Sequence, residues 1–573
     1  MRRLAIARVY GYIMNRTNKL RGLLCLLAIS ALSACGGGGS SPVDAAPAAA
    51  SGRAQAAAAT DPVWVKITNE YASFTVSGTQ TVRYGAGSSW ITKQVTSKGV
   101  CSNTFFGGDP AHGVVKECDL ATYPVVTSSV TAKLAASRVT GVAPLAVLFD
   151  ATGSSSSTAG LDPFRQLTYS FNFGDDRGLV WSVDGLPKNT ETGGPIASHV
   201  FDVAGTYVVK VRATDPTSGD YADSTVTVTV TAPDAAYSGT KTVCVSAAKN
   251  YTGCPTGAAL ATALPTGTDW NGKRVLLARG ETFGDVSILD GNSGVQVGAY
   301  GTGNAPVVSS VGVGNWRPQT ANFATDITIM DLAVANSMTQ SLGKQVLFYR
   351  NDLTSVSDGH GIYTGGISYW AESDPWRVVP TSSFYYANQI FVIENKVTGS
   401  FNDGGYNYFG DGSQLAMLGN VMGTSRYHTA RFTKVRKAII AHNELKGINP
   451  AGTYHSLKLH SGGLTAYTDA YVDDAWYSDQ VVVAHNVFGD AADTNQWTVA
   501  ICPENDTYAE GVASVLVDSN SFIRNSRTSQ DLTLGGKQLT YRTNAIVGGG
   551  TLWEGVGHDG ALPADWKGPY YSN

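Results

Sequence analysis

Apolar residues recur through the C-terminal half of the chain in short runs that each end in asparagine. The asparagines of seven aligned runs are Asn351, Asn395, Asn420, Asn443, Asn486, Asn520 and Asn544. Their spacings of 44, 25, 23, 43, 34 and 24 residues indicate a repeat of about 24, with a second coil inside each doubled step and a loop inside the step of 34. Strand, asparagine turn and strand in each repeat predict a right-handed parallel β-helix over residues 240–573, with the asparagines stacked in its turns.

The residues before this repeat alternate between apolar and polar positions. Residues 61–127 contain three such segments, which are separated by glycines: Tyr71–Gly78, Gln80–Gly85 and Trp90–Lys93. Alternation of this kind predicts a small antiparallel β module. The segment resembles a disulfide-bearing accessory module of exported bacterial carbohydrate enzymes.

Residues 128–232 carry a sharper set of motifs. These are Phe149–Ser154, Tyr169–Asp176, His199–Phe201 and Gly205–Val209. The segment resembles a PKD domain over nearly its whole length, which implies an immunoglobulin-like β-sandwich. PKD domains are spacers or weak binders of polysaccharide and protein, and we expect a spacer here.

The composition agrees with an all-β protein. Charged residues make up only 15% of the chain, whereas it holds 65 Gly, 27 Tyr and 11 Trp, a balance that excludes long amphipathic helices and coiled coils. Lys and Arg total 41 against 45 Asp and Glu, for a net charge of −4. The chain therefore has no global positive field, and we expect no nucleic-acid partner.

The N-terminus has the features of an export signal. The apolar run Leu23–Ile29 follows three basic residues and is too short to span a membrane. The segment Leu32–Gly36 follows shortly after this run and resembles the lipoprotein box. The resemblance implies that residues 1–35 are a signal peptide and that Cys35 carries lipid. Glycine rather than aspartate after Cys35 implies an outer-membrane lipoprotein, at the cell surface or the periplasmic face; ordinary secretion is the alternative. Residues 36–60 are predicted to be a flexible linker.

An exported protein favours disulfides. Pairing Cys101 with Cys118, and Cys244 with Cys254, closes two short local loops. Cys502 is then left over, and we expect it to be a small buried apolar residue rather than a nucleophile.

Candidate chemistry concentrates in residues 426–460 of the predicted β-helix. Tyr427-His428 followed by Arg431 is matched 27 residues later by Tyr454-His455 followed by Lys458 and then His460. About one coil apart, the two segments place Arg431 beside Lys458 and His428 beside His455. Period-two alternation puts the two cations on one face and the two imidazoles on the other, so only one pair can face the groove, and the other pair must point inward or lie at a turn.

This stretch is also locally cationic. It contains one acidic residue, Glu444, and seven basic residues: Arg426, Arg431, Lys434, Arg436, Lys437, Lys446 and Lys458. A positive groove concentrates an anionic polymer and offsets the negative charge of a uronate carboxylate. An acidic polysaccharide is therefore the predicted partner, and we expect the protein to be a monomer. The predicted substrate-binding side chains are His460, Arg426, Lys434, Tyr406, Tyr408 and Trp497.

Cleavage of a uronate polymer by β-elimination needs a neutralised carboxylate, a base for the C5 proton and an acid for the leaving oxygen. Arg431 is the predicted clamp, Lys458, His428 or His455 the base, and Tyr427 or Tyr454 the acid. The arrangement resembles the alginate lyase and chondroitinase B group, which implies a Lys and an Arg on nearby coils and often Ca²⁺. Here the order is Arg then Lys, and no cluster of acidic residues matches the calcium ligands of that group.

Two other functions stay open. Asp358–Tyr363 contains a Gly-His-Gly that resembles polygalacturonases, which implies hydrolysis by clustered aspartates. A non-catalytic surface protein that binds glycan is the third interpretation, in which the basic column is only a solvated face of the β-helix.

Overall fold

A computed structural model describes residues 62–122, 128–315, 322–341, 343–356, 361–365, 387–399, 406–423, 425–447, 454–460, 478–502 and 512–556. Nearly all regular structure in these ranges is β-strand, which confirms the all-β fold class. The chain divides into two compact units, one ending at Val125 and one beginning at Val126. Within the described ranges, no helix has the length and apolar character needed to cross a membrane.

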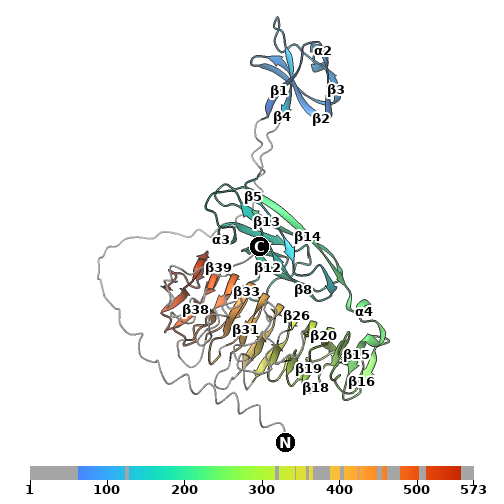
Figure 1. The fold of residues 1–573 in the computed structure, drawn as a ribbon, viewed down its shortest axis with the longest axis vertical. Coiled ribbons are helices and arrows are strands. Elements are labelled where there is room, and N and C mark those ends of the chain that lie inside the picture. Colours follow the sequence, from blue (N-terminus) through green and yellow to red (C-terminus); the bar gives the residue numbers. More distant parts are fainter. Residues whose placement is uncertain are drawn as a thin grey trace, which may run out of the picture. The chain divides into compact units, whose positions relative to one another are not determined.

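The first unit is a single antiparallel sheet in the order β1-β4-β2-β3 (Figure 1). Its elements are β1 (Val63–Asn69), β2 (Ser73–Ala86), β3 (Ser89–Val100), α2 (Asn103–Phe106) and β4 (Glu117–Thr122). Val82, Tyr84 and Phe106 form its core around the disulfide between Cys101 and Cys118. The predicted antiparallel module and its disulfide are confirmed.

The second unit begins with a β-sandwich of two main sheets, β11-β10-β13-β14-β7 and β12-β8-β6. Its elements are β5 (Val130–Thr131), β6 (Ala135–Ala136), β7 (Thr140–Val142), β8 (Leu145–Asp150), β9 (Ser155–Ser156), α3 (Pro163–Gln166), β10 (Thr168–Asn172), β11 (Thr190–Gly193), β12 (Ile196–Phe201), β13 (Gly205–Thr214) and β14 (Tyr221–Thr231). Alternate residues of both sheets, such as Phe149 and Phe171, are buried between them. The connection α4 (Pro233–Ala236) and η1 (Gly239–Lys241) leads into the rest of the unit.

The remainder of the second unit is a parallel β-helix whose coils present three faces. Face A, which carries the candidate site, consists of β19 (Val286–Ile288), β22 (Val311–Val313), β25 (Met338–Ser341), β28 (Ile362–Gly365), the first part of β31 (Tyr408–Leu418), the first part of β33 (Ala430–Ala441), β35 (Leu457–His460), β38 (Trp497–Ile501), β41 (Gln530–Leu534) and β44 (Glu554–Val556). Each strand pairs in parallel with the strand of the next coil.

Face B follows face A in each coil. It consists of β15 (Thr242–Val245), β17 (Arg274–Ala278), β20 (Ser293–Tyr300), β23 (Thr325–Met330), β26 (Lys344–Tyr349), β29 (Asn388–Ile393), the second parts of β31 and β33, β36 (Ser478–Ala484), β39 (Val512–Asp518) and β42 (Lys537–Arg542). The short β16 (Ala259–Ala261) pairs with β15, beside the predicted disulfide between Cys244 and Cys254, which is also present.

Face C completes each coil with short strands. It consists of β18 (Thr282–Phe283), β21 (Val307–Val308), β24 (Ala333–Val334), β27 (Asp352–Val356), β30 (Lys396–Gly399), β32 (Val421–Met422), β34 (Glu444–Leu445), β37 (Val487–Phe488), β40 (Ser521–Phe522) and β43 (Ala545–Ile546). Inward side chains of all three faces form one continuous apolar core.

The turn from face B to face C contains the predicted asparagine ladder. The amide nitrogen of Asn420, for example, donates to Oδ1 of Asn443 at 2.8 Å, and Asn443 donates to Asn486 at 2.9 Å. The same bond links each neighbouring pair from Asn351 to Asn544. The ladder is confirmed at all seven positions.

The predicted second coil inside each doubled step is wrong. Asn351 and Asn395, 44 residues apart, are bonded directly, and so are Asn443 and Asn486, 43 residues apart. Each long step is therefore one coil that contains an insertion. The insertions fall in residues 366–386 and 461–477, after the face A strands β28 and β35 and outside the described ranges.

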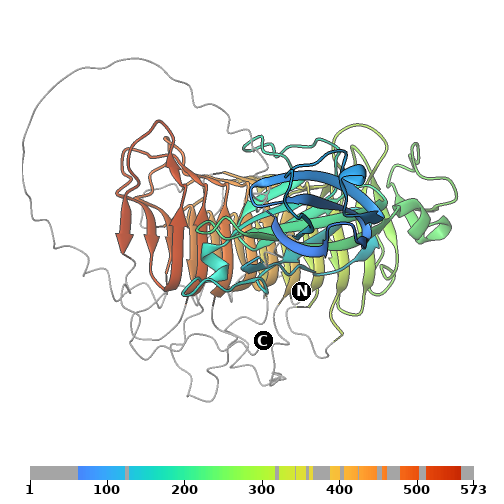
Figure 2. The same cartoon turned by 90° about the horizontal axis from the view of Figure 1, so that it is seen from above.

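We expected the sandwich to be a spacer. It is not held apart from the β-helix but packs on face B. Its strands β12 and β8 contact β33 and β31, respectively (Figure 1), and Figure 2 shows the successive coils of the β-helix side by side. A shared apolar cluster joins Leu148 and Ile196 of the sandwich to Phe391, Leu418 and other outward side chains of face B. These outward positions of face B are apolar because the sandwich covers them, so face A carries the candidate chemistry.

Candidate functional site

Strands β33 and β35 bring the two predicted cations together on face A. Arg431 pairs in register with Lys458, which places the two positions about 4.8 Å apart across neighbouring strands. Ala430 and Phe432, on either side of Arg431, are buried in the core of the β-helix. By strand alternation Arg431 and Lys458 therefore point outward.

The two predicted histidines lie at the turns that lead into these strands. His428 precedes β33 and His455 precedes β35, both nearly fully buried, and their rings stack at a centroid distance of 5.0 Å. Tyr406 lies 6.1 Å from His428, and Trp497 lies 5.6 Å from His455. Four successive coils thus contribute one column of rings beside the cations.

The two predicted tyrosines form a second pair next to this column. The rings of Tyr427 and Tyr454 are 4.5 Å apart, and Tyr427 is 5.7 Å from Tyr406. Burial, with a smaller effect from Tyr427, raises the pKa of Tyr454 to about 12. Its phenol is therefore protonated at neutral pH and can donate a proton but cannot act as a base.

Two partners fix the guanidinium of Arg431. Its Nε donates to Nε2 of His460 at 2.9 Å, and its Nη1 donates to the hydroxyl of Tyr406 at 3.0 Å. Because arginine has no acceptor, Nε2 of His460 must be the unprotonated nitrogen. His460 and Tyr406, which the sequence predicts to bind substrate, hold the guanidinium of Arg431; their contact with substrate stays a prediction.

The proton positions on the stacked histidines follow from their contacts. The backbone N–H of His455 donates to Nδ1 of His428 at 3.0 Å, so that nitrogen is unprotonated. Nδ1 of His455 lies 3.1 Å from the same atom and must carry the hydrogen, because two lone pairs would repel. The lone pair of a neutral His455 is therefore on Nε2, which is buried and has no hydrogen-bond partner in the described part of the chain.

Both imidazoles are neutral at pH 7. Burial is the largest cause that lowers the pKa of His428 and of His455 well below the usual value, and nearby positive groups lower it further. These groups are the cations Arg431 and Lys458; a proton on His460, or on His455 in the case of His428, would add to the same effect. Each imidazole is therefore in the form that can accept a proton, in a positively charged environment.

Lys458 has one neighbour that the sequence did not suggest. Its ammonium donates to the sulfur of Cys502 at 3.4 Å. Cys502 is buried and unpaired, as predicted for a leftover cysteine. The contact could not be predicted from the sequence, because Lys458 and Cys502 are 44 residues apart and the coil between them contains an insertion.

The other predicted residues are more scattered. Tyr408 was predicted to bind substrate, which is wrong, because its ring is fully buried in the core and its hydroxyl bonds to Thr364. Arg426 is exposed at the turn before His428. The side chain of Lys434, the lipid site Cys35 and the Gly-His-Gly at 359–361, apart from Gly361, lie outside the described part of the chain.

A metal site was left open by the sequence. Among the described residues, no group of three or more His, Cys, Asp or Glu side chains could hold a metal ion. The described side chains around Arg431 and Lys458 are cations, neutral imidazoles and phenols, which do not fit the oxygen-rich ligand set of Ca²⁺.

Comparison with known proteins identifies one domain. Residues 131–245 match the PKD domain family, which accounts for the sandwich. The chain is also similar to two solved structures from Azotobacter vinelandii. The mannuronan C-5 epimerase AlgE4 A-module is 12% identical, with 56% of this chain and 93% of that chain covered at a TM-score of 0.30. The AlgE6 A-module of the same enzyme class is 12% identical, with 55% and 92% covered at a TM-score of 0.28.

Proposed function

We propose that this protein is a polysaccharide lyase that cleaves an acidic, uronate-containing glycan by β-elimination on face A. The observation that carries the proposal is the pairing of Arg431 with Lys458 beside two neutral histidines, the protonated phenol of Tyr454 and its neighbour Tyr427. Elimination needs these three kinds of group together.

The first requirement is to offset the charge of the uronate carboxylate. Two outward cations about 4.8 Å apart can converge on a single carboxylate, and Arg431 offers the planar donor geometry that suits it. Withdrawing charge from the carboxylate makes the proton on the neighbouring C5 more acidic. His460 and Tyr406 hold the guanidinium in place for this role.

The second and third requirements are a base and an acid. The base that removes the C5 proton is either a neutral imidazole of the stacked pair, with Lys458 kept as a cation, or Lys458 itself in its unprotonated form, with Arg431 alone offsetting the carboxylate. A bound carboxylate would offset the cations that lower the pKa of His455 and would so make that imidazole a stronger base. Tyr454, or its neighbour Tyr427, is assigned as the acid that protonates the leaving oxygen. No step is assigned to calcium.

The test is an assay of purified protein on a panel of uronate polymers. Ultraviolet absorbance of unsaturated uronate products should rise with time. Arg431→Ala and Lys458→Ala should each lower the rate about 10²- to 10³-fold, the usual cost of losing a group that stabilises transition-state charge. Lys446→Ala is the matched control, because Lys446 belongs to the same basic stretch but pairs with Asp490 beside face C.

The same assay separates the alternatives. Reducing ends without unsaturated product would indicate a hydrolase, and polymer retained without any product would indicate a binding protein. Inversion at C5 without chain cleavage would indicate an epimerase, because epimerisation shares the removal of the C5 proton. Full activity in both alanine variants would remove the site assignment. Added Ca²⁺ and a chelator in parallel reactions test for a metal requirement.

We also propose that the protein is tethered to the outer membrane through lipid on Cys35. The support is the lipoprotein box Leu32–Gly36 and the flexible composition of residues 36–60. In a bacterial host, the wild type should fractionate with outer membranes, and Cys35→Ser should not enter that fraction. Equal distribution of the two proteins would contradict the tether.

A further inference from the structure

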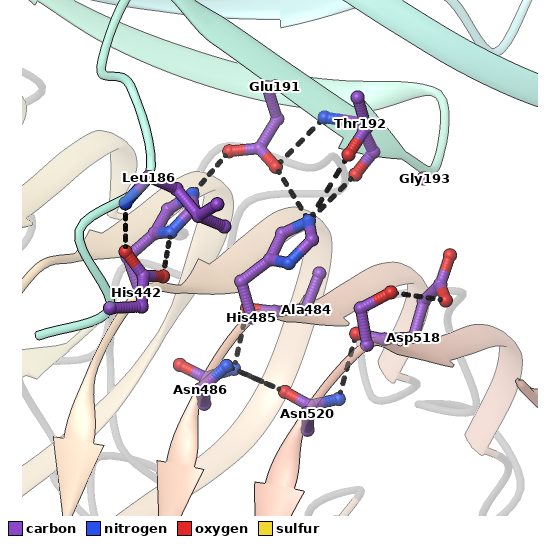
Figure 3. A network of polar contacts seen from close by, with 12 residues as sticks. Leu186, Glu191, Thr192, Gly193, His442, Ala484, His485, Asn486, Asp518 and Asn520 are labelled. Carbon is purple, nitrogen blue, oxygen red and sulfur yellow. Dashed lines mark hydrogen bonds and ion pairs between the residues drawn. The ribbon is translucent and has the colours of Figure 1, made fainter. Parts of the chain in front are cut away.

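Two of the seven asparagine runs share the sequence Ala-His-Asn. They are Ala441–Asn443 and Ala484–Asn486, and they place His442 and His485 immediately before a ladder asparagine. This position has a left-handed backbone, with φ of 57° at His442 and 55° at His485. The two imidazoles lie one coil apart at the edge of face B and stack at 5.1 Å (Figure 3).

Both nitrogens of His442 face carboxylates of the PKD domain. Nδ1 is 2.6 Å from Oδ2 of Asp184, and Nε2 is 2.9 Å from Oε2 of Glu191. A carboxylate accepts and cannot donate, so both nitrogens must carry hydrogen and the ring must be a cation. His442 is only 1% exposed, and Trp181 of the PKD domain stacks on it at 4.9 Å.

His485 extends the contact along the next coil. Its Nε2 lies 3.3 Å from the carbonyl oxygen of Thr192, to which it donates, and 3.6 Å from Oε1 of Glu191 (Figure 3). Glu191 is therefore placed between the two imidazoles. His442, Asp184 and Glu191 form one largely buried polar cluster, which we call the histidine latch, and His485 lies beside it.

Other ion pairs join the PKD domain to the β-helix at several coils. Lys188 pairs with Glu394 on the coils before His442, Lys437 pairs with Asp150, and Arg138 pairs with Asp326. Their cations are lysine and arginine side chains. Histidine is the component whose charge can change at lower pH.

We propose that the histidine latch makes docking of the PKD domain pH-sensitive: the buried imidazolium of His442 holds Asp184 and Glu191 on the β-helix, and loss of its proton loosens that contact. This inference is independent of any activity on face A. A deprotonated ring keeps one N–H and leaves one carboxylate buried opposite a lone pair. Such an uncompensated buried charge is strongly unfavourable.

The pH range follows from the sign of the shift. Burial is the largest single influence and by itself lowers the pKa of His442, but Glu191 and Asp184 together outweigh it and raise the pKa to about 9. A raised pKa gives stabilisation that is complete below the unfolded value of 6.5 and is lost as the pH rises through about 9. Between these limits the docking equilibrium should fall by up to about tenfold per pH unit.

The first experiment measures the protonation of His442 in the intact wild-type chain. Hydrogen–deuterium exchange at the imidazole Cε1, followed by mass spectrometry, gives a titration midpoint for each histidine. The midpoint of His442 should lie near pH 9, whereas His428 and His455 in the same sample should titrate below 6.5. A midpoint of His442 at or below 6.5 would overturn the proposal, and this result needs no variant.

The second experiment measures docking directly. Pulsed amide exchange should show that the protection of β8 and β12 decreases between pH 7 and pH 10 in the wild type. In His442→Gln protection should already be reduced at pH 7 and should change little up to pH 10. His485→Gln, on the neighbouring coil, is the matched control and should keep the wild-type pH dependence. An identical pH profile in the wild type and His442→Gln would refute the latch.

Discussion

At the scale of single residues, the site depends on how Arg431 is held. His460 accepts from Nε and Tyr406 accepts from Nη1, so two side chains from coils on either side restrict the guanidinium. A long flexible side chain gains little from a carboxylate if it must be ordered at the moment of binding. We therefore treat His460 and Tyr406 as positioning residues.

A pair of substitutions at His460 tests this role. His460→Ala removes the acceptor for Nε of Arg431 and should lower kcat/KM on a uronate polymer by about tenfold or more, the usual worth of a charge-assisted hydrogen bond. His460→Gln retains an acceptor oxygen and should recover most of the loss. Steady-state kinetics of both variants decide the matter, and equal losses would show that the imidazole acts in some other way.

Residue-level prediction succeeded along strands and failed at their ends. The period of two correctly set Arg431 beside Lys458 on one face, but it left open which pair faces outward and whether the other pair points inward or lies at a turn; the structure places the histidines at turns. The same period could not separate Tyr406 from Tyr408, which have equal parity. Tyr408 is the first residue of β31 and points into the core, whereas Tyr406 precedes the strand and is not subject to its alternation.

At the scale of elements, the asparagine ladder is the main polar support of the coils. The amide of Asn443 donates to two carbonyl oxygens and to Asn486, and its Oδ1 accepts from Asn420. All of these groups are buried, so none could turn to water if the side chain were removed. Interior members of the ladder should therefore matter more than its last member.

Asn443→Ala is expected to lower the free energy of unfolding by about 3 kcal/mol or more, because it leaves several buried groups unpaired. Asn544→Ala, at the half-buried end of the ladder, should cost about 1 kcal/mol. Denaturant unfolding followed by circular dichroism measures both values. Equal losses at the two positions would mean that the ladder contributes little beyond local turn geometry.

The ladder was predictable because asparagine recurs at the same point of every apolar run. The number of coils was not, since a step of 44 residues fits either two plain coils or one coil with an insertion. The pairing of β26 with β29 and the direct bond between Asn351 and Asn395 separate these cases. Insertions occur after β28 and β35, next to face A, and leave the asparagine turn unchanged.

At the scale of the whole second unit, the PKD domain covers an apolar face of the β-helix that would cause aggregation if it were exposed to solvent. Phe391, Leu418, Leu516 and neighbouring side chains of face B are buried beneath it. The expectation of a spacer came from the resemblance to PKD domains. The sequence did not reveal the contact, because apolar residues on the outer side of a coil look the same as core residues in a one-dimensional pattern. The folds of the PKD domain and of the β-helix could be predicted from the sequence, but the contact between them could not.

Deleting the PKD domain tests this dependence. A chain lacking residues 128–232 should expose face B and should aggregate, because a contiguous apolar patch of this kind is an association surface. A chain lacking residues 62–122, which belong to the separate first unit, should stay monodisperse. Light scattering and dye binding of the purified proteins distinguish the two; a soluble, well-folded PKD deletion would contradict the role assigned to the interface.

Stability of the whole chain should peak near pH 6.5. Burial lowers the pKa of His199, His428 and His455, so their contribution is present above the unfolded value and is lost as the pH falls below it. His442 acts in the opposite sense, and its contribution is lost between 6.5 and about 9, by up to about 1.4 kcal/mol per pH unit. Thermal unfolding from pH 5 to pH 9.5 should show both limbs. His442→Gln should flatten the alkaline limb alone, and an unchanged alkaline limb would contradict this account.

The reach of the PKD domain has a further consequence for how the solenoid comes apart. Its hydrogen bonds extend from Gln296, near the first coils, to Arg542, in the last strand of face B. Repeat arrays whose units touch only their neighbours can fray from either end, one rung after another. The PKD domain contacts both early and late coils and so couples their stabilities. The β-helix should therefore unfold in one cooperative transition rather than coil by coil from its ends.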